Sequence, residues 1–153
     1  MSTPKRILVA TDFGDSSGGA IALGVDLAEK IDAALTILHA VEFPTYSYAF
    51  EPPIDLLTQL ETGARAMLEK EVARARQSVP GANGVLRHGS PTDTILAFAA
   101  QDGSDLLVVG THGRRGVPHW LLGSVAEKLV RLCPFPVLTV RGAGRAEGKG
   151  GAP

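Results

Sequence analysis

The hydrophobic positions alternate between short continuous apolar runs and longer segments in which apolar residues recur every three or four positions. Continuous runs are typical of strands covered on both faces, and the wider spacing is typical of amphipathic helices. The runs predict strands at residues 7–10, 34–41, 85–88, 106–110 and 136–140. The spaced segments predict helices at residues 15–32, 54–79, 91–99 and 123–132.

Strands that alternate with helices favour a parallel sheet with helices on both faces, because each parallel connection needs a crossover that returns over the sheet. We therefore predict a single, doubly wound α/β domain. Ligands of such sheets bind beyond the carboxyl ends of the strands, where the strand order reverses. The residues at these ends are Asp12, Val41 and Gly110.

Composition and charge narrow the class of protein. A chain of 153 residues, 44% hydrophobic and 20% charged, suits one core. Its net charge of -1 gives no global attraction to nucleic acid or to an anionic membrane, so any anion recognition must be local. The chain shows no signal-peptide core and no apolar run of membrane-spanning length. We therefore predict a soluble, cytoplasmic protein that binds neither nucleic acid nor a membrane.

The stretch GTHGRRGVPHWLLGS, residues 110–124, joins a predicted strand to a predicted helix. Its glycines permit close approach of the backbone to a ligand, and the N-terminus of the following helix favours an anion. A polyphosphate fits this description, with added charge from Arg114 and Arg115 and a hydroxyl donor at Ser124, which would also cap the helix. The alternative is that these glycines only shape a turn before a helix.

Better-known phosphate loops are missing. The sequence has no G-x-x-x-x-G-K-[ST] motif, and Gly142-Ala143-Gly144 resembles the start of G-x-G-x-x-G but has no room for a following helix. His112 and His119 lack the tight spacing of metal ligands, so no protein metal site is predicted.

Three motifs together point to a known family. The pattern G-x2-G-x9-G-[ST] is joined by ILVATDF near the start and CPFPVLTVR near the end. With these motifs the chain resembles the universal stress protein family over about residues 4–141. The resemblance implies a five-stranded sheet of order 3-2-1-4-5, a homodimer through the last strand at residues 136–140 and, in the branch that keeps the glycine pattern, ATP binding. The domain would span residues 1–141, and the glycine-rich residues 142–153 predict a disordered tail.

The resemblance also implies roles for individual residues. Asp12 matches an acidic residue after the first strand, where it either binds the ligand, which we favour, or caps the turn. The backbone of Val41 would read adenine. The other positions border the adenosine, the ribose or the phosphates: Ala10, Thr11, Val109, Gly110, Gly113, Gly123, Ser124 and Val125. Thr11 occupies a position at which proline or valine is frequent in the family. Its hydroxyl is either tolerated or alters the packing of adenine. Arg114 and Arg115 lie in a variable stretch, so their phosphate role is inferred from charge alone.

These observations predict a nucleotide-dependent stress-response regulator that binds ATP, with Mg²⁺ arriving on the nucleotide, and signals through a homodimer to a protein partner that the sequence does not identify. The loop offers cradling groups but no evident general base, so catalysis is expected to be slow or absent. A low-turnover ATP hydrolase or self-phosphorylating enzyme is the first alternative, and a partner-binding protein that ignores nucleotide is the second. His39 is predicted to be a core histidine. The aromatic-rich segment at residues 43–50 is predicted either to cover the site or to contact a second copy of the chain.

Overall fold

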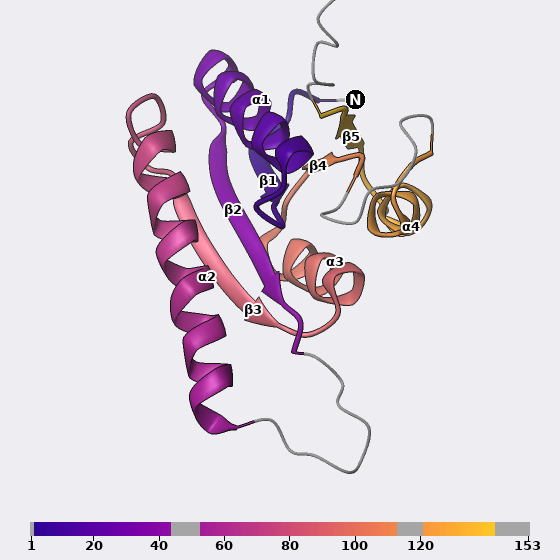
Figure 1. The fold of residues 1–153 in the computed structure, drawn as a ribbon. Helices are drawn as coiled ribbons and strands as arrows, with labels where there is room; N and C mark the ends of the chain where they lie inside the picture. The colour runs from indigo at the N-terminus through magenta and orange to yellow at the C-terminus, as the bar shows by residue number, and fades with distance from the viewer. Residues whose placement is uncertain (1, 44–52, 113–120, 143–153) are drawn as a thin grey trace, which may run out of the picture.

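The strands form one parallel sheet with helices between them. The computed structural model describes residues 2–43, 53–112 and 121–142. Along the chain the elements are β1 (Arg6–Ala10), α1 (Asp15–Ile31), β2 (Ala34–Val41), α2 (Ile54–Ala75), β3 (Asn83–His88), α3 (Pro91–Asp102), β4 (Leu106–Gly110), α4 (Ser124–Leu132) and β5 (Val137–Val140) (Figure 1). Each predicted strand is present, with its start displaced by at most two residues.

Strand β1 is the centre of the sheet. It pairs in parallel with β2 on one side and with β4 on the other. β3 joins β2 and β5 joins β4, so the strand order is β3-β2-β1-β4-β5. The predicted α/β fold with order 3-2-1-4-5 is confirmed. The direction of winding reverses between β1 and β4, and this is the point at which open α/β sheets bind their ligands.

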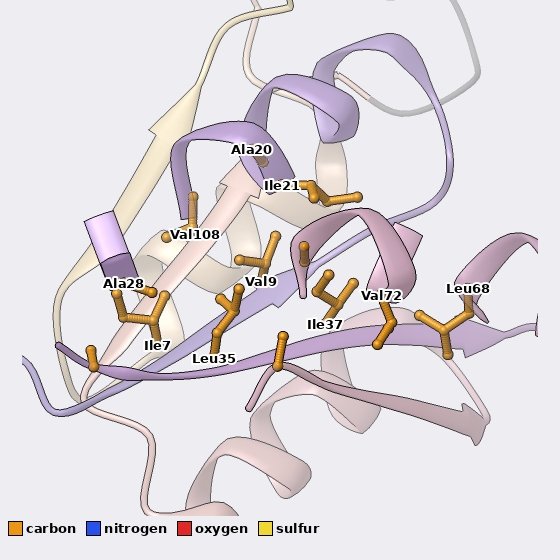
Figure 2. Close-up of a cluster of buried hydrophobic side chains, with 13 residues drawn as sticks. Ile7, Val9, Ala20, Ile21, Ala28, Leu35, Ile37, Leu68, Val72 and Val108 are labelled. Atoms are coloured by element: carbon orange, nitrogen blue, oxygen red, sulfur yellow. The ribbon is translucent and has the colours of Figure 1, made fainter. Parts of the chain in front are cut away.

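The two faces of the sheet carry separate cores. Helices α1 and α2 pack on one face, where a single cluster of buried side chains includes Val9 of β1, Ile21 of α1 and Val72 of α2 (Figure 2). Ile7 belongs to the same cluster. Helices α3 and α4 cover the other face, where Leu8 packs with Ile95 and Leu129. Successive residues of β1 therefore point into different cores, which explains why its sequence is apolar without alternation.

Helix α2 ends earlier than its hydrophobic spacing predicts. The last helical residue is Ala75, not residue 79. The N–H groups of Gln77 and Ser78 donate to carbonyls only three residues back, so the chain tightens into a turn. Pro80 follows, and a residue before proline is disfavoured in the helical conformation. Periodicity alone does not register this stop, because Val79 still fits the apolar face.

Several predicted features fall outside the described residues. These are the aromatic segment after Phe43, residues 113–120 of the glycine-containing stretch at residues 110–124 (the glycine loop), and the tail beyond residue 142. Within the three described segments, none of the helices has both the length and the apolar character needed to cross a membrane.

Candidate functional site

A cavity of about 950 Å³ lies at the carboxyl edge of the sheet. Its volume is in the range of about 300–1,000 Å³ that is usual for small-molecule sites. The ends of β1, β2 and β4, one face of α2 and the starts of α3 and α4 form its wall. It is lined by every predicted site residue that the structure describes: Ala10, Thr11, Asp12, Val41, Val109, Gly110, Gly123, Ser124 and Val125. The remaining three, Gly113, Arg114 and Arg115, lie outside the described residues.

The turn after β1 is held by its own side chains. Asp12 Oδ1 accepts hydrogen bonds from the Gly14 N–H at 2.8 Å and from the Ser17 hydroxyl at 2.9 Å. The Thr11 hydroxyl donates to Ser17 Oγ at 3.0 Å and accepts from the Phe13 N–H at 3.0 Å. The Thr11 hydroxyl is thus used within the turn. Asp12 caps the turn and also lines the cavity, so these two roles do not exclude each other.

Two aromatic side chains stand beside this turn. Phe13 has a φ of 62°, a left-handed backbone conformation that is rare for a bulky residue, and its ring centroid lies 4.4 Å from that of His39. His39 Nδ1 is 2.7 Å from the Thr11 carbonyl oxygen. Because a carbonyl oxygen can only accept, Nδ1 carries the proton. His39 has a polar partner, as a core histidine would, but it is half-buried on the cavity wall and is not a core residue.

Gly110 is required by the packing of the fold. A Cβ atom at this position would lie 2.5 Å from Ser16 Oγ and 2.8 Å from the Ser17 backbone nitrogen, at the start of α1. The Ser16 hydroxyl also bonds to the backbone of His112, whose N–H donates to it at 3.1 Å. The missing side chain of Gly110 therefore lets α1 approach the end of β4. Packing alone therefore explains why this position is a glycine, although Gly110 also lines the cavity.

Helix α4 begins at the cavity with its N-terminus open. Gly123 is the N-cap residue in an extended conformation, none of the described side chains caps the helix, and Ser124 is the first helical residue. The prediction that Ser124 caps the helix is wrong, because Ser124 is already the first helical residue, one position past the N-cap at Gly123 from which a side chain can accept the N–H groups of the first turn. The exposed side chain of Ser124 and the first N–H groups of α4 instead lie at the cavity wall.

The end of β2 presents its backbone to the cavity. The Leu38 carbonyl accepts the Thr11 N–H at 2.9 Å, on the side of β1, whereas the Val41 carbonyl accepts the Gly89 N–H at 3.0 Å, on the side of β3. The backbone groups of successive strand residues face opposite neighbours. Those of Ala40 and Glu42 therefore face the side of β1, beyond the point where β1 turns away. Both residues line the cavity.

Comparison with known proteins settles the family. The chain matches the universal stress protein family over residues 3–141. It belongs to this family. A relative from Thermus aquaticus, "Universal stress protein in QAH/OAS sulfhydrylase 3'region", is 36% identical over 139 residues, which cover 90% of this chain and 98% of the relative.

Solved structures of family members share the fold. The universal stress protein UspA from Lactobacillus plantarum superimposes with a TM-score of 0.78 at 26% identity, covering 92% of this chain and 100% of that protein. A universal stress protein solved in complex with cAMP gives a TM-score of 0.71 at 27% identity, covering 93% of this chain and 100% of that protein.

One wall of the site in this universal stress protein was missed by sequence reasoning. A face of α2 lines the cavity through Gln59, Leu60, Gly63, Ala64 and Met67. These positions have helical spacing, which predicts the helix but not that one of its faces borders the site. The available signal was the place of α2 in the order of elements, because the helix that follows a strand of a parallel sheet starts from the carboxyl edge, where the site is formed.

The histidines of the described segments do not form a metal centre. No group of three or more His, Cys, Asp or Glu side chains in residues 2–43, 53–112 and 121–142 is arranged to hold a metal ion. His112 Nδ1 lies 2.8 Å from the Thr111 hydroxyl at the cavity wall. His88 is exposed outside this wall, stacked on Phe43 at 5.2 Å and 3.4 Å from a Glu61 carboxylate oxygen. His119 lies outside the described residues.

Proposed function

We propose that this universal stress protein binds an adenine nucleotide, ATP with Mg²⁺, in the cavity at the carboxyl edge of the sheet, and that it acts as a nucleotide-dependent regulator. The observation that carries the proposal is the open N-terminus of α4. Its first turn lies on the cavity wall without a capping side chain. Unpaired N–H groups and the positive end of the helix dipole favour a phosphate at this position.

The phosphates would lie against Gly123, Ser124 and Val125. The backbone N–H groups of the first turn of α4 supply donors, and the exposed Ser124 hydroxyl supplies another. Gly113, Arg114 and Arg115 keep their predicted phosphate roles as part of the same proposal. A magnesium ion would arrive on the phosphates, which together with water provide the oxygen ligands that it prefers.

The base would lie at the end of β2. Adenine presents an amino donor and a ring-nitrogen acceptor side by side, and the Ala40 carbonyl followed by the Glu42 N–H offers the complementary order. Val41 lies between them, but its carbonyl already accepts the Gly89 N–H, so we assign base recognition to its two neighbours. The relative solved with cAMP shows that a fold of this kind holds an adenine nucleotide, which supports the assignment.

Asp12 would meet the ribose between these two ends. Its carboxylate is held by Gly14 and Ser17 at the cavity wall, and an ionised carboxylate accepts hydrogen bonds from sugar hydroxyls. Hydrolysis requires a base that positions a water molecule as well as charge stabilisation. We therefore assign binding, with slow turnover at most, as the function of the site.

The signal would be passed through a homodimer. Strand β5 is one of the two edge strands of the sheet, and its residues Val137–Val140 are all half-buried. Exposed Val130 and Leu132 of the neighbouring α4 extend the apolar surface. An apolar strand at a sheet edge is usually covered or paired. We propose antiparallel pairing of residues 136–140 with a second copy, which light scattering at physiological concentration would refute by giving a monomeric mass.

Two substitutions at one position test the phosphate end. Ser124→Ala removes the hydroxyl alone, whereas Ser124→Pro removes the hydroxyl and the N–H. Proline is well tolerated at the first helical position, and Gly123 already has the extended backbone that precedes proline (φ -60°, ψ 157°).

We expect nucleotide-free protein to bind ATP in calorimetry, with affinity about tenfold lower for Ser124→Ala and at least about a hundredfold lower for Ser124→Pro, since each lost hydrogen bond to a charged group contributes about 1.5 kcal/mol or more. Equal ATP affinity in all three proteins would refute phosphate binding at α4. Absence of binding to the wild type would favour the partner-binding alternative, and rapid phosphate release would favour the hydrolase.

A further inference from the structure

Gly63 lies in the middle of α2, on the wall of the cavity. Glycine is among the poorest residues for a helix interior, because it loses the most backbone freedom on folding. A glycine at such a position therefore calls for a reason, either in the fold or in the site.

The fold does not supply this reason. A Cβ atom at Gly63 would meet no heavy atom of the described residues within 4 Å beyond the backbone of its own helix, whereas a Cβ at Gly24 would lie 2.4 Å from Val9 and one at Gly84 would lie 2.6 Å from Val72. Among the described glycines with positive φ are Gly89 and Gly103, but not Gly63. An alanine at position 63 would thus keep both the backbone conformation and the packing.

The surroundings of Gly63 point to the part of a ligand that is flat and apolar. Leu60 and Met67, one turn away on either side, each expose 41% of their surface while lining the same cavity. The neighbouring Ala64 is buried, so this face of α2 lies partly inside the molecule. Leu60 and Met67 form two apolar ridges with a dip at Gly63 between them. The polar groups for phosphate lie elsewhere, at the start of α4.

We propose that Gly63 is a specificity-determining residue of the nucleotide site, and that its missing side chain leaves the space in which the purine base lies against α2. This inference rests on the proposed function, because it concerns the base end of the same cavity. It adds α2 to the strand ends and the glycine loop as a part of the protein that selects the ligand.

The test is a series of side chains at position 63. Calorimetric affinities for ATP and AMP are measured on the wild type, Gly63→Ala, Gly63→Leu and Gly63→Phe, with Ala66→Leu as the matched control. Ala66 is exposed on the same helix but does not line the cavity. Melting temperatures are measured on the same samples, and Gly63→Ala is expected to melt at or above the wild-type temperature.

We expect Gly63→Leu and Gly63→Phe to lose at least tenfold in affinity for ATP and AMP alike, Gly63→Ala to lose about threefold, and Ala66→Leu to bind as the wild type does. Equal losses for the two nucleotides exclude an effect on the outer phosphates and locate it at the part that they share, which includes the base. Wild-type affinity in Gly63→Leu and Gly63→Phe would overturn the inference and leave the proposed function standing. Failure of the wild type to bind either nucleotide would instead overturn the proposed function, and this inference with it.

Discussion

The two edges of the same sheet are built for different purposes. At the amino edge, polar side chains tie one strand to the next. At the carboxyl edge, polar groups hold the turn after β1, tie it to His39 of β2 and tie the start of α1 to His112, yet a cavity remains between the helices. The difference teaches that the ties at the carboxyl edge of this sheet stay close to the turn after β1 and leave the space beyond the strand ends available for a ligand.

The amino edge is closed by two aspartates. The Asp105 carboxylate, just before β4, accepts the backbone N–H groups of Lys5 and Arg6 at 2.9–3.0 Å and so joins β4 to β1. Asp102, at the end of α3, pairs with the Arg6 guanidinium at 2.9 Å and accepts the Ser104 hydroxyl at 2.8 Å. Burial raises the pKa of Asp102, but the hydrogen bonds from Arg6 and Ser104 and the charge of Arg6 outweigh this effect, so its pKa lies below the ordinary value.

The largest effect is expected from placing a side chain between the end of β4 and the start of α1. Gly110→Val would place a side chain against Ser16 and the Ser17 backbone, and overpacking of this kind costs about 3 kcal/mol of unfolding free energy. Urea unfolding followed by circular dichroism measures the change. Gly81→Val is the control, because a Cβ there meets nothing within 4 Å, and we expect it to change stability by less than about 1 kcal/mol. Equal stability of the two variants would show that Gly110 is not needed for packing.

A smaller effect, confined to stability, is expected at the amino edge. Asp105→Ala leaves the N–H groups of Lys5 and Arg6 without their acceptor and should cost about 1–3 kcal/mol of unfolding free energy. ATP affinity should stay at the wild-type value, because the cavity lies at the opposite edge. A tenfold loss of affinity in folded Asp105→Ala protein would contradict the separation of the two edges.

The smallest effect concerns the acid stability of the Arg6–Asp102 pair. A folded-state pKa below the ordinary value of 3.8 means that the pair stabilises the fold above about that pH, and that the contribution is lost as the pH falls through the lowered folded value. Asp102→Asn should therefore be less stable than the wild type at neutral pH, and the two proteins should converge below pH 3.8. Urea titrations at several pH values measure this difference. A constant difference would show that the charge of Asp102 is not its cause.

Hydrophobic spacing predicted the sheet well, because strands covered on both faces leave continuous apolar runs such as Ile7 to Ala10. The strand order came from the family resemblance, since no local pattern records which strands become neighbours. The end of α2 was missed because Val79 continues the periodicity while Pro80 prevents the helix from continuing.

The candidate site was predicted where it depends on strand ends and missed where it depends on a neighbouring helix. Asp12 and Gly110 follow from the topology of a parallel sheet. The packing role of Gly110 did not, because it depends on the distance between α1 and β4, which are far apart in sequence. Gly63 carries no motif, and its place on the cavity wall is visible only once α2 is positioned.

The most direct test of the account is to titrate nucleotide-free protein with ATP and with ITP under the same conditions. Inosine reverses the donor and acceptor that adenine presents, so the Ala40 carbonyl and the Glu42 N–H would each face a like group. We expect ATP to bind at least about tenfold more tightly than ITP, since two mismatched hydrogen bonds cost about 1.4 kcal/mol or more. Equal affinity for the two nucleotides, or binding of neither, would contradict recognition of adenine at the carboxyl edge of the sheet.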